Sequence, residues 1–390
     1  MTIMYKKLLV FIAACMGMSF FGICMISIGS ILPSLSAALQ MDELAASTLV
    51  LFLPVGIMVG SLLFGPIVDR WGYKYLLISS SLLVAVGLAG LAYFAQVLPL
   101  QLSIFTIGLG GGVLNGLTNA LVSDITTDAD RGAKLSLLGT FYGVGALGLP
   151  SLLGFLSGYY DYKSILMAIS VFIALCLVFF FAIAFPKAKQ KQGAPIWAGF
   201  TLLGKPVLLL MGFILFFQSA LEGVANNWTT TYLGKVSEMT PEQALFALTC
   251  MVAGLTAARI LTAGLFNKIG ERRLLIGSLS LALLGFGLLL FPVSMLSAYV
   301  GLALVGVGVA ATFPVVFSIL GRTFSENSGT VFSIALVIAL TGNTLINYLM
   351  GLLSKFGGPW AYPLLSIGSV CMMLILYVSY EAWARKQAQD

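Results

Sequence analysis

Histidine is absent from this sequence of 390 residues, and charged residues make up only 9% of it, against roughly 25% in an ordinary soluble domain. So few charges cannot cover the surface of a water-soluble protein of this size. The sequence also lacks an HExxH motif, a P-loop and a Cys/His cluster, so it offers little from which to build a nucleophile–base pair, a common metal site or a nucleotide-driven pump. We therefore expect no enzyme activity, no cofactor and no bound metal.

Cysteines are few, and all five lie within apolar stretches, without metal-ligand spacing: Cys15, Cys24, Cys176, Cys250 and Cys371. We expect buried free thiols. The formal net charge of +6 does not indicate nucleic-acid binding, because the basic residues lie in short connections between apolar runs rather than on one face.

Long apolar runs dominate what is present, since 59% of the residues are hydrophobic. A run of about 20 apolar residues is long enough to cross a bilayer as a helix. The sequence therefore predicts an all-α integral membrane protein with twelve transmembrane helices. They are expected near residues 7–33, 44–68, 75–96, 99–123, 134–158, 163–185, 206–233, 243–266, 274–292, 296–321, 329–354 and 360–382.

The placement of Lys and Arg predicts the orientation of these spans. Sixteen of the 20 Lys and Arg residues lie at the termini or in the connections that follow even-numbered spans, and three lie in the opposite connections. Because positive residues are retained on the cytoplasmic side, both termini are expected there. We expect a multi-pass protein of a bacterial cytoplasmic (inner) membrane, in contact with the lipid bilayer.

The longest connection, residues 186–205, divides the chain into an N-terminal half of six helices (1–185) and a C-terminal half of six (206–390). A shift of 198 positions superimposes residues 60–78 on 258–276 and aligns Leu76-Leu77-Ile78 with Leu274-Leu275-Ile276. An internal repeat of this kind is typical of secondary transporters. We predict two pseudo-symmetric halves joined by a cytoplasmic linker.

The segment GPIVDRWGYK, Gly65 to Lys74, resembles the signature between spans 2 and 3 of the major facilitator superfamily, and Gly264 to Arg272 is a degenerate copy. The resemblance covers essentially the whole chain. It implies the major facilitator fold, alternating access and a conformational role for the signature. An aspartate at a helix end can cap a neighbouring helix and pair with nearby arginines. The gating residues implied are Gly65, Asp69, Arg70, Gly72 and Lys74.

Within that superfamily, two segments resemble the fucose-permease-like sugar/proton symporters: Glu222-x5-Trp228-x3-Tyr232, and residues 119–150. The chain departs from that group at two places. Residues 8–33 contain no acidic residue, and Asn115 stands where the group has a span-4 glutamate. The resemblance therefore implies a sugar transporter whose proton coupling does not use the usual acidic pair.

Two ionisable residues lie deep within the predicted spans, Glu222 and Arg259. A charge at the bilayer centre costs about 2.5–3.5 kcal/mol on insertion scales, so each is a functional candidate for proton coupling. Their depths allow an ion pair, and such a pair can serve packing alone. Glu222 can act either as an acceptor for substrate hydroxyls or as the proton carrier.

Amide side chains extend this polar inventory. Gln218, Glu222 and Asn226 follow each other at intervals of four on one helix face, with Asn227 and Trp228 beside them. Span 4 carries Asn115 and Asn119, and span 11 carries Asn343 and Asn347. Amides and a carboxylate suit a neutral, polyhydroxylated solute, and a tryptophan face suits the C–H groups of a sugar ring. The family resemblance implies that these polar residues of spans 4, 7 and 11 line one substrate-binding path.

Two alternatives remain open at this point. The span-4 amides can serve interhelical hydrogen bonding, and Trp228 can be an interfacial anchor. The run from Gly143 to Pro150 also resembles a glycine/proline element of drug/proton antiporters. The leading prediction is a monomeric secondary transporter that moves a small polar solute and couples this movement to protons. A sugar is the solute that the residues suit best. The alternative is efflux of amphiphilic drugs or other organic compounds.

Overall fold

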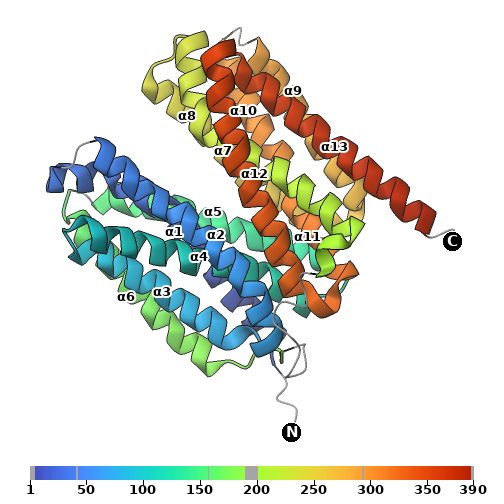
Figure 1. Ribbon diagram of the computed structural model, residues 1–390, viewed down its shortest axis with the longest axis horizontal. Coiled ribbons are helices and arrows are strands. Elements are labelled where there is room, and N and C mark those ends of the chain that lie inside the picture. Colours follow the sequence, from blue (N-terminus) through green and yellow to red (C-terminus); the bar gives the residue numbers. More distant parts are fainter. Residues whose placement is uncertain (1–4, 41–42, 157, 189–200, 292–293, 388–390) are drawn as a thin grey trace. The chain divides into compact units, whose positions relative to one another are not determined.

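The chain folds into helices in a computed structural model that describes residues 5–40, 43–156, 158–188, 201–291 and 294–387 (Figure 1). No strand occurs in these ranges. The helices are α1 (Lys7–Leu39), α2 (Glu43–Trp71), α3 (Tyr73–Tyr93), α4 (Val97–Ile125), α5 (Arg131–Leu156), α6 (Tyr162–Ala182), α7 (Pro206–Val236), α8 (Pro241–Ile269), α9 (Glu271–Leu290), α10 (Met295–Val309), α11 (Thr312–Thr323), η2 (Ser325–Asn327), α12 (Ser328–Gly357) and α13 (Ala361–Gln387).

Twelve segments are long and apolar enough to cross a membrane, which confirms the predicted number of spans. The tenth span, predicted near 296–321, is confirmed as one span over Met295–Thr323, but its helix is not continuous. The structure divides it into α10 and α11, with a turn at Ala310 and Ala311. Pro314 explains the break, because a proline has no N–H for the carbonyl four residues earlier and its ring collides with that carbonyl.

The contacts divide the chain into two compact units. Unit 1 comprises Met1–Thr127, Leu138–Thr201 and Phe324–Ile334, and unit 2 comprises Asp128–Leu137, Leu202–Thr323 and Ala335–Asp390. The predicted halves 1–185 and 206–390 differ from these units at two segments: the start of α5 belongs to unit 2, and the start of α12 belongs to unit 1. Most of the predicted linker, 189–200, lies outside the described residues, so its role stays a prediction.

Glycines bring helix backbones together inside unit 1. A Cβ built on Gly56 of α2 would lie 2.4 Å from the carbonyl oxygen of Phe105, and one on Gly108 of α4 would lie 2.3 Å from that of Leu53. Such close approach needs small residues, which replace the hydrophobic effect as the basis of helix association in lipid. Helices α2 and α4 therefore pack with their backbones in contact.

The same close contacts of glycines with helix backbones occur in unit 2, 198 positions later in the chain. Gly254 of α8 (56 + 198) meets the carbonyl oxygen of Ala303 at 2.4 Å, and Gly306 of α10 (108 + 198) meets that of Met251 at 2.0 Å. Their contacts are also displaced by 198, from Phe105 to Ala303 and from Leu53 to Met251. The internal repeat seen in the sequence is thus repeated in the packing of α8 on α10.

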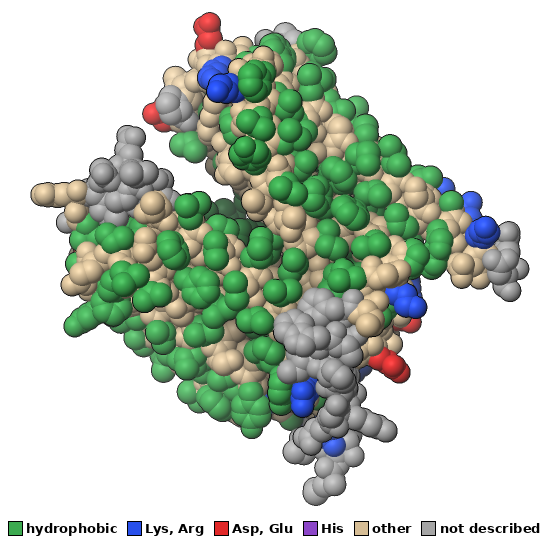
Figure 2. Space-filling model, in the orientation of Figure 1, with side chains coloured by type: hydrophobic (Ala, Val, Ile, Leu, Met, Phe, Trp, Pro, Cys, Tyr) green, Lys and Arg blue, Asp and Glu red, His purple; other side chains and the backbone are tan. Residues whose placement is uncertain are grey.

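Large hydrophobic side chains cover much of the exterior. Figure 2 shows hydrophobic side chains spread across the visible face, whereas the Lys, Arg, Asp and Glu side chains in view lie toward its edges. Exposed examples include Phe155 at 81% and Val178 at 67%. In water such a surface would be an aggregation hazard, whereas in a bilayer it faces lipid tails. The polar groups inside each unit are therefore the places to look for function.

Candidate functional site

Two polar residues of α7 join to form the centre of the candidate site in unit 2. Gln218 is fully buried and its Nε2 donates to Glu222 Oε1 at 2.8 Å and to the carbonyl oxygen of Val309 at 3.2 Å. The spacing of four residues puts both side chains on one face of the helix, as predicted. Gln218 Oε1 is buried and has no hydrogen-bond partner in the described structure. A buried acceptor of this kind is costly unless a water or a ligand satisfies it.

Val309 supplies its carbonyl because α10 ends there. The last carbonyls of a helix have no N–H partner within that helix, so they are available to other donors. The break that Pro314 imposes on the tenth span therefore creates the acceptor for Gln218 Nε2. This is a contribution that the sequence analysis missed, because it took 296–321 as one helix. A proline within a predicted span was the signal that could have shown it.

The charges of Arg259 on α8 and Glu222 on α7 interact electrostatically, and the predicted ion pair between them stays a prediction. The arginine is only 8% exposed. Its backbone is held by α5, whose Ser136 donates to the carbonyl oxygen of Arg259 at 2.7 Å and contacts Thr262 Oγ1 at 2.5 Å. A carboxylate with a nearby guanidinium is less costly to bury than either charge alone.

A second polar cluster in unit 2 joins α7 to α12. Asn227 Nδ2 donates to Asn347 Oδ1 at 3.0 Å, and Asn347 Nδ2 donates to both the carbonyl oxygen and Oδ1 of Asn343, each at 2.9 Å. Gly223 makes this possible, since a Cβ there would lie 2.3 Å from Asn343 Oδ1. We call Asn227, Asn343 and Asn347 the amide cluster. It lies beside the Glu222 site, because Gly223 is the next residue of α7.

The remaining α7 candidates have different surroundings. Asn226 is exposed, so it is not drawn into the contacts that Gln218 makes with Glu222. Trp228 is half-buried and lines a small cavity with Tyr232, Met350 and Tyr362. An aromatic-walled cavity is compatible with both roles considered for this tryptophan, contact with a ring-shaped solute and anchoring near the membrane surface.

The span-4 amides belong to unit 1 and interact with each other. Asn119 Nδ2 donates to the carbonyl oxygen of Asn115 at 2.7 Å and lies 3.4 Å from its Oδ1. Asn119 is 8% exposed, whereas Asn115 is half-buried. This arrangement leaves polar atoms of Asn115 available to a solute, while the local hydrogen bond satisfies part of Asn119. The substrate-binding role of both residues stays a prediction.

Asp69, at the end of α2, caps the first turn of α12. Its Oδ1 accepts from the Gly329 N–H at 3.2 Å, and its Oδ2 accepts from the Thr330 N–H at 2.8 Å and from Thr330 Oγ1 at 2.7 Å. The carboxylate is 1% exposed. It faces the positive end of the helix dipole, where a negative charge is stabilising. All these atoms lie in unit 1, because the start of α12 belongs there.

The other residues of the signature have separate tasks. Gly65 lets α2 approach α12, since a Cβ there would lie 2.6 Å from the carbonyl oxygen of Gly329. The Arg70 guanidinium lies 5.0 Å from the centre of the Trp71 ring. Gly72 has φ +83°, a value that favours glycine. Lys74 Nζ donates to two carbonyl oxygens at the end of α6, those of Phe181 at 2.8 Å and Ile183 at 3.0 Å.

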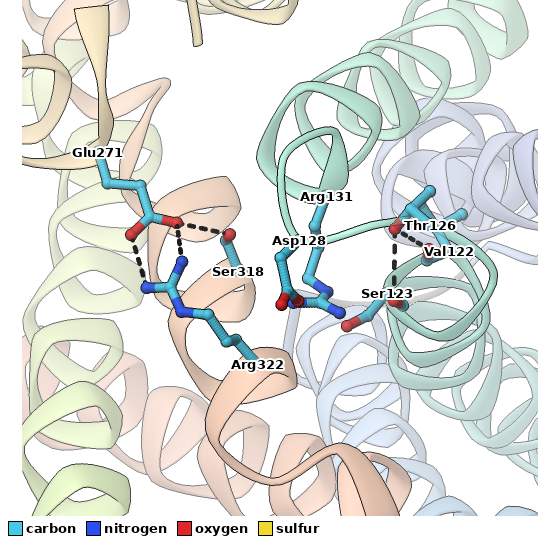
Figure 3. A network of polar contacts seen from close by, with 8 residues as sticks. All are labelled: Val122, Ser123, Thr126, Asp128, Arg131, Glu271, Ser318 and Arg322. Carbon is cyan, nitrogen blue, oxygen red and sulfur yellow. Dashed lines mark hydrogen bonds and ion pairs between the residues drawn. The ribbon is translucent and has the colours of Figure 1, made fainter. Parts of the chain in front are cut away.

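Further polar contacts at helix ends were not expected from the sequence. In unit 2, Arg322 Nη2 lies 2.9 Å from Glu271 Oε2, and Ser318 donates to Glu271 Oε1 at 2.7 Å (Figure 3). Asp128 and Arg131 form a second ion pair at 2.5 Å. In unit 1, Tyr73 donates to Asp124, which also accepts from Ser328 at 2.8 Å. In the sequence each of these residues is an ordinary polar residue near a helix end, and none belongs to a motif that would have predicted its contact.

No group of three or more His, Cys, Asp or Glu residues that could hold a metal ion occurs in the described ranges. The site is instead a set of amides, one carboxylate and one guanidinium. Such groups bind and release a solute without forming a bond to it.

The sequence profile of the Major Facilitator Superfamily matches residues 9–335 and 239–388. The chain belongs to this superfamily. It is a membrane transporter rather than an enzyme, with the major facilitator fold of two pseudo-symmetric halves of six helices.

Three known proteins show the breadth of the superfamily around this chain. The glucose/mannose transporter GlcP of Bacillus subtilis is 23% identical over 86% of each chain. The multidrug resistance protein MdtH of Aeromonas salmonicida is 33% identical, but over 35% of this chain and 34% of its own. FucP, a fucose:proton symporter of E. coli, has a TM-score of 0.80 at 17% identity, covering 94% of this chain and 97% of its own. At that identity the structural likeness shows the fold alone.

Proposed function

We propose that this transporter carries a small neutral polyhydroxylated solute, most closely a monosaccharide, coupled to protons. The observation that carries the proposal is the contact between buried Gln218 and half-buried Glu222, which leaves the Gln218 Oε1 acceptor unsatisfied and lies beside the amide cluster. Amides and a carboxylate exchange hydrogen bonds with several hydroxyls at once. The sugars transported by GlcP and FucP support the same solute class.

Glu222 is the proposed proton carrier. In this role its carboxylate alternates between pairing with Arg259 and holding a proton when the solute is bound, so that a solute and a proton cross together. The acidic residue that the fucose-permease-like group carries in span 1 is missing here, and Glu222 is the acidic residue deepest within the predicted spans. Its interaction with Arg259 gives the unprotonated form a partner.

The test is uptake of labelled glucose, mannose, fucose and xylose into proteoliposomes, with and without an inward proton gradient. The proposal expects accumulation above equilibrium for at least one of these sugars in the gradient. Glu222→Gln should abolish the accumulation while preserving exchange of the sugar between the two sides. Glu242→Gln is the matched control, because Glu242 is exposed at the start of α8. Accumulation that survives Glu222→Gln would remove the proton role, and no uptake of any sugar would remove the solute class.

Efflux of amphiphilic compounds is the second candidate, and the similarity to MdtH over about a third of the chain favours it. The two functions differ in what stabilises the purified protein. Ligands that bind the folded state raise its thermal stability. Stabilisation by amphiphilic cations but not by sugars, together with raised drug tolerance of expressing cells, would establish efflux in place of sugar uptake.

We further propose that the Asp69 cap on α12 is a gate and that its release is a step of alternating access. We also propose that both termini lie in the cytoplasm of a bacterial cell, because of the distribution of Lys and Arg. We propose a monomer, because each half of the chain supplies one wall of the transport path. Cysteine-accessibility labelling of an engineered cysteine beside Lys163, in a connection expected outside, tests the orientation in intact cells.

A further inference from the structure

An apolar groove runs along the exposed face of α9 and α10 in unit 2. It has a volume of about 760 Å³, and its lining comprises Ser280, Leu283, Leu284, Gly287, Leu288 and Leu304. The Ser280 hydroxyl does not make the groove polar, because it donates to the carbonyl oxygen of Ile276 within its own helix at 2.9 Å. The lining is therefore hydrocarbon along its whole length.

The groove exists because α9 and α10 touch at glycines on one side of it. A Cβ on Gly285 would lie 2.5 Å from the carbonyl oxygen of Gly301, and one on Gly308 would lie 2.3 Å from Ala282 N. On the exposed side, Gly287 has no side chain to fill the space, and a Cβ there would meet nothing within 4 Å. The close contact between α9 and α10 and the missing side chain at Gly287 together leave a groove on this face. Side chains would otherwise fill the space between two packed helices.

Arg273 lies on the same face of α9 as this groove. It precedes Ser280, Leu284 and Gly287 by 7, 11 and 14 residues, spacings that place all four within about 40° of one line along an α-helix. Arg273 is exposed, and the described structure records no ion-pair partner for it. Its neighbour Arg272, in contrast, pairs with Glu381 at 3.1 Å. A cation without a recorded ion-pair partner among the described residues therefore lies on the line of the groove, about two helical turns before its first lining residue, Ser280.

The length of the groove, about 12 Å along α9, is comparable to the hydrocarbon thickness of one leaflet of a bilayer. Ser280 and Leu288 are 7 and 15 residues beyond Arg273, or about 10 and 22 Å along the helix axis. The hydrocarbon of one leaflet is about 15 Å thick, half of the full core. A phosphate beside Arg273 would thus place an acyl chain at the depth of the groove.

We propose that Arg273 and the α9–α10 groove form a binding site for one anionic phospholipid, with the phosphate at the guanidinium and an acyl chain against Leu284, Gly287 and Leu304. Charge complementarity favours this occupant, since an anionic lipid brings a net negative charge to the guanidinium that a neutral lipid lacks; a second protein chain on this face is an outcome that the test below separates. The proposal does not depend on which solute the protein carries, because lipid binding is measured without transport.

The test is native mass spectrometry of the full-length protein in neutral detergent, titrated with dioleoyl phosphatidylglycerol or dioleoyl phosphatidylcholine. One phosphatidylglycerol should bind more tightly than phosphatidylcholine. Arg273→Gln should weaken phosphatidylglycerol about fivefold, the effect of one basic residue at a membrane surface, and leave phosphatidylcholine unchanged. Arg273→Lys should retain the preference. Glycerol phosphate at equal concentration should not bind, because the acyl chain supplies the rest of the affinity.

Two matched controls separate the site from general lipid contact. Arg385→Gln removes another exposed cation, in the last turn of α13, and should change nothing. Gly287→Leu fills the groove and should weaken both lipids, whereas Gly368→Leu, at a similarly open glycine of α13, should weaken neither. Equal affinity for the two lipids, or equal effects of Arg273→Gln and Arg385→Gln, would overturn the proposal. So would a dimer that forms through this face and is disrupted by Gly287→Leu.

Discussion

Replacing Asp69 by asparagine tests how strongly one carboxylate holds the start of α12. The carboxylate accepts three hydrogen bonds, from two N–H groups and one hydroxyl, and is almost completely buried. Asparagine has the same shape, but it keeps one acceptor oxygen and loses the charge that faces the helix N-terminus. Loss of a helix cap and of the dipole interaction costs about 2 kcal/mol in a buried setting.

Hydrogen–deuterium exchange measures this cost where it arises. A local opening that becomes easier by about 2 kcal/mol exchanges about 30-fold faster, because 1.4 kcal/mol corresponds to a factor of ten. We therefore expect about 30-fold faster exchange at Gly329 and Thr330 in Asp69→Asn. Asp69→Ala should exchange faster still, since it leaves both N–H groups without an acceptor.

Asp161→Asn provides the matched control for this experiment. Asp161 also caps a helix, accepting from the Ser164 N–H at 2.9 Å at the start of α6, but it is exposed. Its replacement should leave the exchange of Gly329 and Thr330 unchanged. Exchange at these two residues within twofold of wild type in Asp69→Asn would refute the reasoning, because the carboxylate would then contribute little to holding α12.

Three further outcomes are expected. Gly223→Ala should reduce solute transport, because the new Cβ would lie 2.3 Å from Asn343 Oδ1 and displace the amide cluster; initial uptake rates measure this. Ser136→Ala should lower the free energy of unfolding by about 1–3 kcal/mol, since it removes a buried donor to α8; chemical denaturation in detergent measures this. The hydrogen bonds from Ser164 lower the pKa of Asp161, so its stabilising effect is present at neutral pH and is lost as the pH falls through that lowered pKa. Thermal unfolding of wild type and Asp161→Asn at several pH values measures this.

Controls for these outcomes come from the same helices. Gly234→Ala changes another glycine of α7, where the nearest atom lies 3.9 Å from the new Cβ, and should leave uptake unchanged. Ser151→Ala removes an exposed hydroxyl of α5 that bonds only to its own helix and should not alter stability measurably. Equal effects of a variant and its control would contradict the corresponding prediction. A wild-type advantage over Asp161→Asn that is unchanged in acid would contradict the third.

Parts of the candidate site were accessible from the sequence because they depend on helix periodicity. Residues four apart on α7 share a face, and Gln218 does donate to Glu222. Periodicity does not tell which helix lies opposite that face. Asn227, expected beside the α7 stripe, donates instead to Asn347, 120 residues away in the chain. The carbonyl that accepts from Gln218 became available only through the break after Val309.

The sequence by itself determined that the chain is a membrane protein of twelve spans, because the insertion of a span depends on the hydrophobicity of about 20 consecutive residues. It also showed the internal repeat, which the glycine contacts of α2–α4 and α8–α10 repeat in space. Only the tertiary structure decided which polar groups pair. In lipid no hydrophobic force selects between neighbouring helices, so close packing and hydrogen bonds do. The resulting hydrogen bonds join residues as distant in the chain as Asp69 and Thr330. No local pattern in the sequence predicts such a pairing.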